Sequence, residues 1–318
     1  MAEALTKTAP LLSFIGSSRY LLDFQPSTFS PGFDSIIQYQ HRRFALQCIR
    51  SWLLGVAVAE TVHGVVVFTR HGDRITKHYG KQVITSLGAQ QCYKVGSDYR
   101  SRYLESDSSH RILDISEDKH IGSQVYASAS DQSLLKSSAT AFLQGLYPPL
   151  VDLDAEVVTS TLNNGSDSTS PLKGYQYVFL NVEKSNSLDT MWIKGDDGCP
   201  ANAAACKSFG TSEEFLTRMD ATKVFTAAST MFSSVYDYKP ENLTYKNADD
   251  IFDLINVACI HNRTWLARNV TDEELFQLRT LADSAEVGSN FNASQLERAI
   301  HAQTLAAGIL EQLSQTVA

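Results

Sequence analysis

Val65-Val66-Val67-Phe68-Thr69-Arg70-His71-Gly72-Asp73-Arg74 is the stretch of sequence that decides the fold. Its first half is apolar, β-branched and aromatic, which is typical of a strand buried in a parallel sheet. Gly72 then permits a tight turn. Two guanidinium groups and an imidazole follow at the carboxyl end of this strand, where open α/β sheets place their ligands. The loop therefore predicts a phosphate site, because arginine pairs with phosphate oxygens bidentately and a neutral imidazole nitrogen can attack phosphorus.

Strand and helix signals alternate on the carboxyl side of this loop. Apolar residues at helical spacing predict a helix over 85–104 with Thr85 as its N-cap. A second strand is expected over 124–129, and a helix over 132–147 that Pro148-Pro149 ends. This alternation indicates an α/β fold with a parallel sheet.

The region 153–245 lacks this alternation, although a strand is expected over 176–182. Later apolar patterns predict a series of amphipathic helices, over 213–220, 248–258, 272–284 and 292–315. We find no internal repeat and no apolar segment long enough to span a bilayer.

The composition of the 318 residues is that of an ordinary globular chain, 43% hydrophobic and 19% charged. The formal net charge of -8 argues against nucleic acid or an anionic lipid surface as a partner. A phosphate site in such a chain has to be a local basic pocket, so the charges of residues 70–74 carry more information than they would in a basic protein.

The segment 42–59 has the layout of a secretory signal. Arg42 and Arg43 precede an apolar stretch, and Ala57-Val58-Ala59 provides a small-x-small cleavage site. Residues 1–40 are then interpreted as an upstream extension or pro-region. The alternative, an amphipathic helix in a cytosolic protein, stays open.

Glycosylation triplets and cysteines agree with a secreted or extracellular (cell wall) location. Every acceptor asparagine lies after the proposed cleavage site: Asn164, Asn242, Asn262, Asn269 and Asn292. Removal of Cys48 with the signal leaves an even set of cysteines, in which Cys199 and Cys206 are expected to close a short loop by a disulfide. Pairing of Cys92 with Cys259 follows only by elimination. No metal site is expected, because no histidine accompanies the cysteine pair at ligand spacing.

Three segments resemble the histidine acid phosphatases, branch two of the histidine phosphatase superfamily. Residues 67–74 resemble the signature Arg-His-Gly-x-Arg, and 84–91 resemble the family's helix start Leu-Thr-x-x-Gly-x-x-Gln. Residues 138–149 are similar to its helix that ends in Leu-(Phe/Tyr)-Pro-Pro, and the helix 298–313 is a weaker match. The resemblance runs from Val65 to the C-terminus, and its character is that of secreted fungal members.

The resemblance implies a phosphoglycerate-mutase-like fold, a three-layer α/β core with a mostly helical inserted cap. The expected divisions are an upstream and signal-like segment (1–59), the first part of the core (60–150), the cap (151–285) and an incomplete return to the core (286–318). His71 would be the catalytic nucleophile, and Arg70 and Arg74 would bind phosphate. The family's reaction implies no metal and no organic cofactor.

The chain departs from the family pattern at two places. Ser130-Asp131-Gln132 stands where the family carries a third phosphate-binding arginine, so Gln132 takes that place with a hydrogen bond but no charge. Lys136, one helical turn on, is an alternative source of the charge. The family's C-terminal His-Asp or His-Ala-Glu motif, which supplies the general acid, is absent, and neither His261-Asn262 nor 301–303 replaces it. The fold is therefore interpreted as C-terminally truncated.

Other polar residues near the loop have open roles. His63 and His78 either line the entrance or lie on the surface, and His110 and His120 are expected to be solvated. Asp73 either orients a neighbouring side chain or occupies a variable position of the loop, and we prefer the second.

Three functions are compatible with these motifs. The first is a secreted acid phosphatase that hydrolyses small phosphate monoesters through a phosphohistidine intermediate. The second is a non-catalytic relative that binds phosphorylated ligands or a partner protein. The third is an intracellular mutase of the same superfamily, against which the signal and the glycosylation triplets argue.

Overall fold

The computed structural model describes residues 11–15, 61–153, 158–185, 187–228, 239–262 and 270–317. By its internal contacts the chain divides into one unit of Met1–Tyr20 with Val62–Ala318 and a second unit of Leu21–Thr61. The signal-like segment 42–59 and the acceptor Asn269 lie outside the described residues. All further structural statements concern the first unit.

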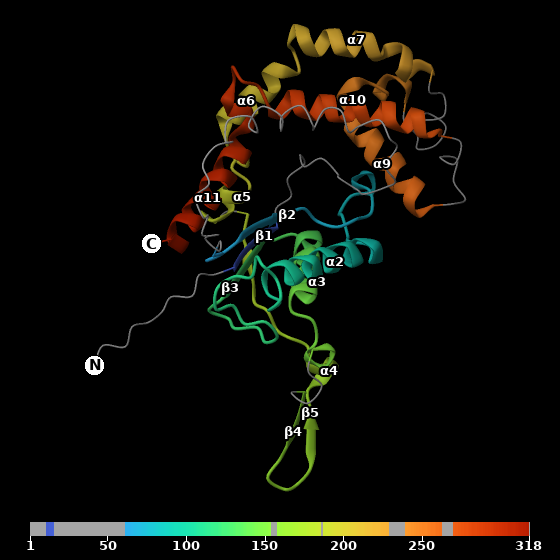
Figure 1. The fold of residues 1–318 in the computed structure, drawn as a ribbon. Coiled ribbons are helices and arrows are strands. Elements are labelled where there is room, and N and C mark those ends of the chain that lie inside the picture. The colour runs from blue at the N-terminus through green and yellow to red at the C-terminus, as the bar shows by residue number, and fades with distance from the viewer. Residues whose placement is uncertain are drawn as a thin grey trace, which may run out of the picture. The chain divides into compact units, whose positions relative to one another are not determined.

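A four-stranded parallel sheet forms the centre of this unit (Figure 1). Its spatial order is β2-β1-β3-β6, and each neighbouring pair is parallel. The strands are β1 (Leu11–Ile15), β2 (Val66–Thr69), β3 (Val125–Ser130) and β6 (Leu180–Glu183). The strands predicted after Val65 and over 124–129 are confirmed. Only Val67 of β2 is fully buried, so β2 is less enclosed than its sequence predicts.

Strand β1 comes from the N-terminal region in which the sequence shows no motif. It pairs with β2 through Ile15 and Thr69, and with β3 through Ile15 and Ala129. A five-residue apolar run has no periodicity that separates strand from helix, which is why the sequence does not predict it. Because β1 precedes Ala59, a chain cleaved there would lose the strand that links β2 to β3.

Helices α2 (Ser86–Tyr103) and α3 (Ser133–Leu146) pack tightly against each other and follow the predicted bounds closely. Figure 1 shows both helices on one side of the sheet. The two glycines show how close the packing is. A Cβ on Gly96 would lie 2.0 Å from the Phe142 carbonyl oxygen, and one on Gly145 would lie 1.9 Å from the Tyr93 carbonyl oxygen. Their apolar faces join β3 in the main core, with Phe142 among its largest buried side chains.

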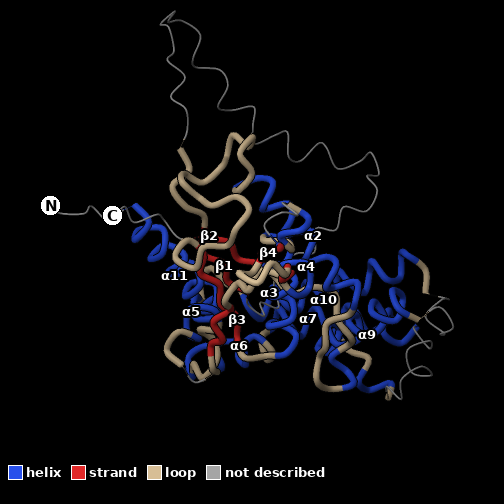
Figure 2. Tube along the Cα trace, turned by 90° about the horizontal axis from the view of Figure 1, so that it is seen from below, coloured by secondary structure: helices blue, strands red, loops and turns tan. Residues whose placement is uncertain are grey.

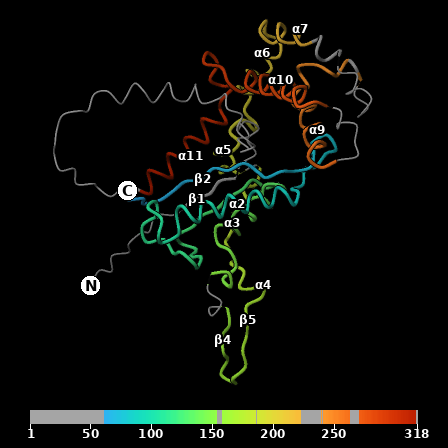
Figure 3. The backbone as a smooth tube through the Cα atoms, turned by 45° about the vertical axis from the view of Figure 1, so that its right-hand side comes forward, coloured from blue at the N-terminus to red at the C-terminus, as the bar shows by residue number. Residues whose placement is uncertain are grey.

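Strand β6 completes the sheet beside β3. It covers the second half of the strand predicted over 176–182, and it lies within the range 151–285 that the sequence assigns to the cap. Before it, β4 (Thr159–Thr161) and β5 (Asp167–Thr169) form an antiparallel hairpin, which Figure 3 shows with its turn.

The remaining chain is largely helical. The longer helices after β6 are α6 (Pro200–Phe209), α7 (Glu213–Ala228), α9 (Ala248–His261), α10 (Asp272–Asn290) and α11 (Ile300–Val317). Short segments are α4 (Pro171–Gly174), α5 (Thr190–Ile193) and the 3-10 turns Lys77–Tyr79, Leu150–Asp152, Pro240–Asn242, Tyr245–Asn247 and Leu296–Ala299.

Helices α9 and α10 pack side by side around a small apolar cluster that includes Ile255 and Leu278 (Figure 2). A capping box begins α10: the Thr271 hydroxyl accepts from Glu274 N, and the Glu274 carboxylate accepts from Thr271 N. The helices predicted over 248–258 and 272–284 are confirmed, and both continue beyond the predicted ends.

The disulfide predicted between Cys199 and Cys206 is wrong in this structure, where both are free thiols. The predicted loop is helix α6, with Cys199 at its N-cap and Cys206 two turns further on. At 1.5 Å per residue their Cα atoms are separated by about 10 Å, beyond the roughly 7 Å that a disulfide spans. The Cys92–Cys259 pairing is not formed either, since both thiols are free and Cys92 is buried.

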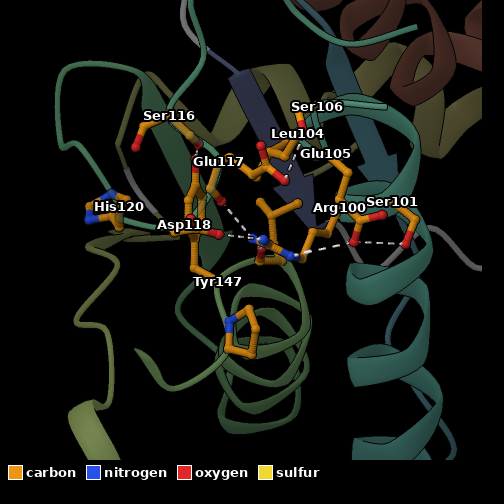
Figure 4. Close-up of polar contacts among 12 residues, drawn as sticks. Arg100, Ser101, Leu104, Glu105, Ser106, Ser116, Glu117, Asp118, His120 and Tyr147 are labelled. Atoms are coloured by element: carbon orange, nitrogen blue, oxygen red, sulfur yellow. Dashed lines mark hydrogen bonds and ion pairs between the residues drawn. The ribbon is translucent and has the colours of Figure 1, made fainter. Parts of the chain in front are cut away.

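A buried arginine organises the end of the core near the C-terminus of α2. Arg100 donates to the Glu117 carbonyl oxygen at 2.6 Å and to the Asp118 carboxylate at 3.2 Å (Figure 4). Tyr147 donates its hydroxyl to the Ser116 carbonyl at 3.3 Å, and burial raises the pKa of this hydroxyl to about 12. These contacts fix the loop between α2 and β3.

The helix contact predicts that Gly96→Ala destabilises the protein although alanine favours helices. The helix-propensity gain of about 1 kcal/mol is smaller than the expected overpacking cost of about 1–3 kcal/mol, because the methyl group meets backbone that has no room to move. Urea unfolding of both proteins measures the net loss. Gly122→Ala is the control, since a Cβ there has nothing within 4 Å; equal stability of Gly96→Ala and the parent would contradict the packing argument.

Candidate active site

The candidate site lies where β2 and β3 end. Ile15 of β1 is level with both Thr69 and Ala129, so the next residues, Arg70 and Ser130, are level as well. Two strand spacings separate them, about 10 Å. The sequence-predicted residues Arg70, His71 and Gln132 therefore share the carboxyl edge of the sheet.

The backbone sets the tautomer of His71. Its Nδ1 lies 2.8 Å from the carbonyl oxygen of Gly72. A carbonyl oxygen can only accept, so Nδ1 carries the proton in the neutral ring. The lone pair is then on Nε2, which makes Nε2 the nucleophilic atom.

The first turns of α2 hold the loop in place through the residues of the Thr-x-x-Gly-x-x-Gln match. Asp73 N donates to Gln91 Oε1 at 2.8 Å, and the Thr85 hydroxyl both caps the helix at Gly88 N and donates to the Asp73 carboxylate. Gly88 allows the contact, because a Cβ there would lie 2.0 Å from the Asp73 carbonyl oxygen. The Thr-x-x-Gly-x-x-Gln residues of α2 therefore hold the loop 70–74 in position.

Helix α3 holds the same loop from a second side. Ser138, fully buried, accepts from Gly72 N at 3.3 Å and donates to the Leu134 carbonyl at 2.9 Å. Cys92 of α2 lies beside this contact, and burial raises the pKa of its thiol, which opposes thiolate chemistry. Within the segment 138–149, Ser138 therefore fixes the backbone of Gly72, in addition to the helix end that the sequence predicts.

Arg74 is held by an aspartate far along the chain. Its Nη2 lies 2.8 Å from Asp253 Oδ1 on α9, and Asp253 Oδ2 accepts from the Thr76 hydroxyl at 2.8 Å and Lys77 N at 2.9 Å. Burial of the Asp253 carboxyl opposes its ionisation, but the hydrogen bond and charge of Arg74 outweigh burial, so the pKa of Asp253 is lowered. The carboxylate is charged and makes a fixed contact on each oxygen.

A hydrogen bond and a pair of lysine–aspartate contacts also join the loop to α9. His261 Nε2 lies 2.6 Å from Asp73 Oδ2, and Lys77 Nζ contacts Asp249 and, at 2.8 Å, Asp250. Burial lowers the pKa of Lys77, but its hydrogen bonds to the two aspartates outweigh burial and raise it. Asp73 contacts Thr85 and His261 rather than a neighbouring arginine or His71, and both interpretations of its role stay predictions.

Sequence reasoning did not identify Asp253 or His261 as part of the site. The pattern of α9 predicts an amphipathic helix whose charges face water. A usable signal is the acidic Asp249, Asp250 and Asp253 on adjacent turns in a chain whose basic residues cluster at 70–77. That signal indicates complementary charge but not contact.

Gln132 and Lys136 do not restore a third charge in this structure. Gln132 is exposed and is the N-cap residue of α3, without a side-chain capping bond. Lys136 Nζ lies 2.7 Å from Asp131 Oδ1, and this pair lowers the pKa of Asp131. The positive charge of Lys136 is therefore directed to Asp131.

The remaining histidines differ from one another in exposure. His63, His78 and His110 are exposed. His120 is half-buried against the Tyr147 ring, with centroids 5.5 Å apart, and burial lowers its pKa. The prediction that His120 is solvated is wrong for this reason.

Neither a metal cluster nor a membrane span is found in the described part of the chain. No group of three or more His, Cys, Asp or Glu is arranged to hold an ion there. Among the same residues, no helix is long and apolar enough to cross a membrane.

Comparison with known proteins agrees with this geometry. The family model described as "Histidine phosphatase superfamily (branch 2)" matches residues 75–257, more than half of the chain. The match begins directly after Arg74 and includes α2, α3 and most of α9. No curated protein matches the chain.

The Asp253 contacts predict a pH-dependent contribution to stability. Its pKa is lowered on folding, so the contribution is complete above the ordinary aspartate pKa of about 3.9 and is lost as pH falls through the lower folded value. We expect Asp253→Asn to lose about 1.5–3 kcal/mol at pH 7, and the difference from the parent to shrink below about pH 4. Urea unfolding between pH 3 and 7 measures it.

Asp131→Asn is the matched control, since the Asp131 carboxyl also has a lowered pKa but is solvent-exposed, where ion pairs contribute little. We expect no measurable change in this variant. A loss in Asp253→Asn that is the same at pH 3 and pH 7 would contradict the ionic origin of the effect.

Proposed function

The chain belongs to the histidine phosphatase superfamily (branch 2), and from this membership and the geometry of the loop we propose that it hydrolyses small phosphate monoesters through a phosphohistidine at His71. The single observation that carries the proposal is the Nδ1 contact of His71 with the Gly72 carbonyl. It leaves the Nε2 lone pair for attack on phosphorus at the carboxyl edge of a parallel sheet.

The reaction has two displacement steps. In the first, the lone pair of His71 Nε2 forms a bond to phosphorus, and the bond from phosphorus to the ester oxygen breaks with its electron pair on the alcohol oxygen. In the second, water attacks phosphorus, loses a proton to solvent, and the P–N bond breaks with its electrons returning to Nε2. The alkoxide released in the first step takes a proton from solvent, so the products are the alcohol and inorganic phosphate.

The arginines provide the electrostatic part of this mechanism. Arg70 and Arg74 flank His71 in the sequence, and guanidinium groups offset the charge that develops on the transferred phosphoryl oxygens. Gln132, the N-cap residue of α3, would offer a hydrogen bond but no charge. This arrangement calls for no metal, because the arginines supply the positive charge.

The proposal includes a secreted, extracellular acid phosphatase. Its support is the glycosylation triplets, of which Asn164, Asn242 and Asn262 are exposed. Glycosylation requires exposed acceptors, so these positions are compatible with it. The mutase alternative is less well supported for the same reasons.

A second candidate is a protein that binds phosphate esters without turning them over. Two observations favour this candidate: Gln132 is exposed, and Lys136 is paired with Asp131. Neither residue therefore supplies a third positive charge to the site. Loss of one charge-assisted contact costs about 1.5–3 kcal/mol, or roughly ten- to a hundredfold in rate if the contact forms only in the transition state.

The test is trapping of the phosphoenzyme. The full 318-residue chain is mixed with p-nitrophenyl phosphate between pH 3 and 7, because p-nitrophenolate leaves without protonation and so does not require a general acid. We expect turnover and an acid-labile phosphate on His71. His71→Ala should lower kcat by at least about a thousandfold, as for other nucleophile removals.

His63→Ala is the control, an exposed histidine outside the loop, and should keep the parent's activity. Activity of His71→Ala equal to the parent would refute the nucleophile. Binding of inorganic phosphate without turnover or phosphoenzyme would favour the second candidate.

A further inference from the structure

We infer that Asp253 of α9 is a positioning residue for phosphoryl transfer, which acts by fixing the guanidinium plane of Arg74. The inference rests on the proposed function and adds a residue 179 positions away from the arginine that it orients. Asp253 has no role in the family signature that the sequence analysis used.

The contacts of Arg74 hold both terminal nitrogens of its guanidinium group. Nη2 is held by Asp253 Oδ1 at 2.8 Å, and Nη1 donates to the Ile75 carbonyl oxygen at 3.1 Å. The Nε–H is buried and has no acceptor among the described residues. Because this Nε has almost no accessible surface, a phosphate could meet Arg74 only through its remaining Nη hydrogens, and the two contacts fix where these hydrogens point.

Asp253 can fix the arginine because the carboxylate itself cannot rotate. Its Oδ2 accepts from the Thr76 hydroxyl and from Lys77 N, while Oδ1 faces Arg74. The side chains of Asp253 and Arg74 are 13% and 12% exposed. Enclosure limits screening by water, so the pair holds its geometry better than a surface pair would.

The contribution of Asp253 is orientation rather than charge. A carboxylate beside Arg74 reduces the net positive potential that a phosphate dianion meets, so Asp253 does not strengthen general attraction of the anion. A fixed guanidinium, in contrast, needs no reorganisation when charge develops on the transferred phosphoryl group. The expected signature is therefore a fall in kcat with little change in KM.

Other contacts of α9 serve as an internal comparison. Asp250 lies on the same helix and pairs with Lys77, which Asp249 also contacts. Asp250 does not contact an arginine in the described structure and is more exposed than Asp253. If the contacts served only to dock α9, Asp250→Asn and Asp253→Asn would lower kcat to a similar extent. If Asp253 positions Arg74, only Asp253→Asn lowers kcat.

The experiment is a double-mutant cycle in the full chain, with p-nitrophenyl phosphate turnover and, separately, calorimetric binding of inorganic phosphate. We expect Asp253→Asn to lower kcat about tenfold with KM and phosphate affinity changed by less than about threefold. In an Arg74→Ala background the same substitution should change kcat by less than about twofold, because the group it positions is gone. Asp250→Asn should keep the parent's kcat.

Thr76→Val is a second, milder variant that tests the inference if Asp253→Asn does not fold. It removes one hydrogen bond to Oδ2 and leaves the ion pair, so we expect a smaller fall in kcat, about threefold, that also disappears in the Arg74→Ala background. Thermal unfolding of every variant accompanies the kinetics.

The outcomes separate this inference from the proposed function. An active parent with an unchanged kcat in Asp253→Asn and Thr76→Val overturns the inference alone. Equal losses in the presence and absence of Arg74 also overturn it, since Asp253 would then act elsewhere. A parent that neither turns over the ester nor binds inorganic phosphate refutes the proposed function, and the inference with it.

Discussion

The contact between the loop 70–74 and the first turn of α2 is the constraint on which the site depends. Gly72 and Gly88 face each other so closely that a Cβ on Gly72 would lie 2.2 Å from the Gly88 carbonyl oxygen. This approach lets Gln91 accept from Asp73 N and keeps the Gly72 carbonyl beside His71 Nδ1. The tautomer of neutral His71 therefore depends on this backbone packing, and a side chain at either glycine would disturb it.

The same loop is tied to a distant helix by charge. Arg74 and Lys77 pair with aspartates of α9, and Asp73 forms a hydrogen bond with His261 of the same helix. In a chain with a net charge of -8, these contacts hold the loop's cations at fixed positions. Asp249, Asp250 and Asp253 are engaged in these contacts, and Asp253 is the one that meets Arg74.

Local features of the fold could be predicted from the sequence, and contacts between distant segments could not. Strand β2, helix α2 with its Thr85 cap, and helix α3 follow from periodicity and capping over short windows. Strand β1 could not be predicted because its five residues form a strand only by pairing with β2 and β3, which are distant in sequence. The 199–206 segment was interpreted as a disulfide loop because two cysteines outweighed the Pro-Ala-Asn-Ala-Ala-Ala run, which favours the helix that forms. The contact of Asp253 with Arg74 could be found only from the tertiary structure, because helical periodicity shows that a helix face is polar but not which residues it contacts.

Whether the site turns over its ligand depends on how far orientation compensates for a missing charge. A third arginine would add attraction for phosphate in every state of the reaction, and much of that attraction lowers KM rather than raising kcat. Orientation of Arg74 by Asp253 acts mainly on the transition state, where charge on the phosphoryl oxygens is redistributed toward fixed donors. A site with Gln132 in place of arginine can therefore bind its ester weakly and still react, provided that Arg74 is held as the contacts with α9 hold it. The contacts of Asp253 with Arg74 and Thr76 favour turnover over binding alone for this reason.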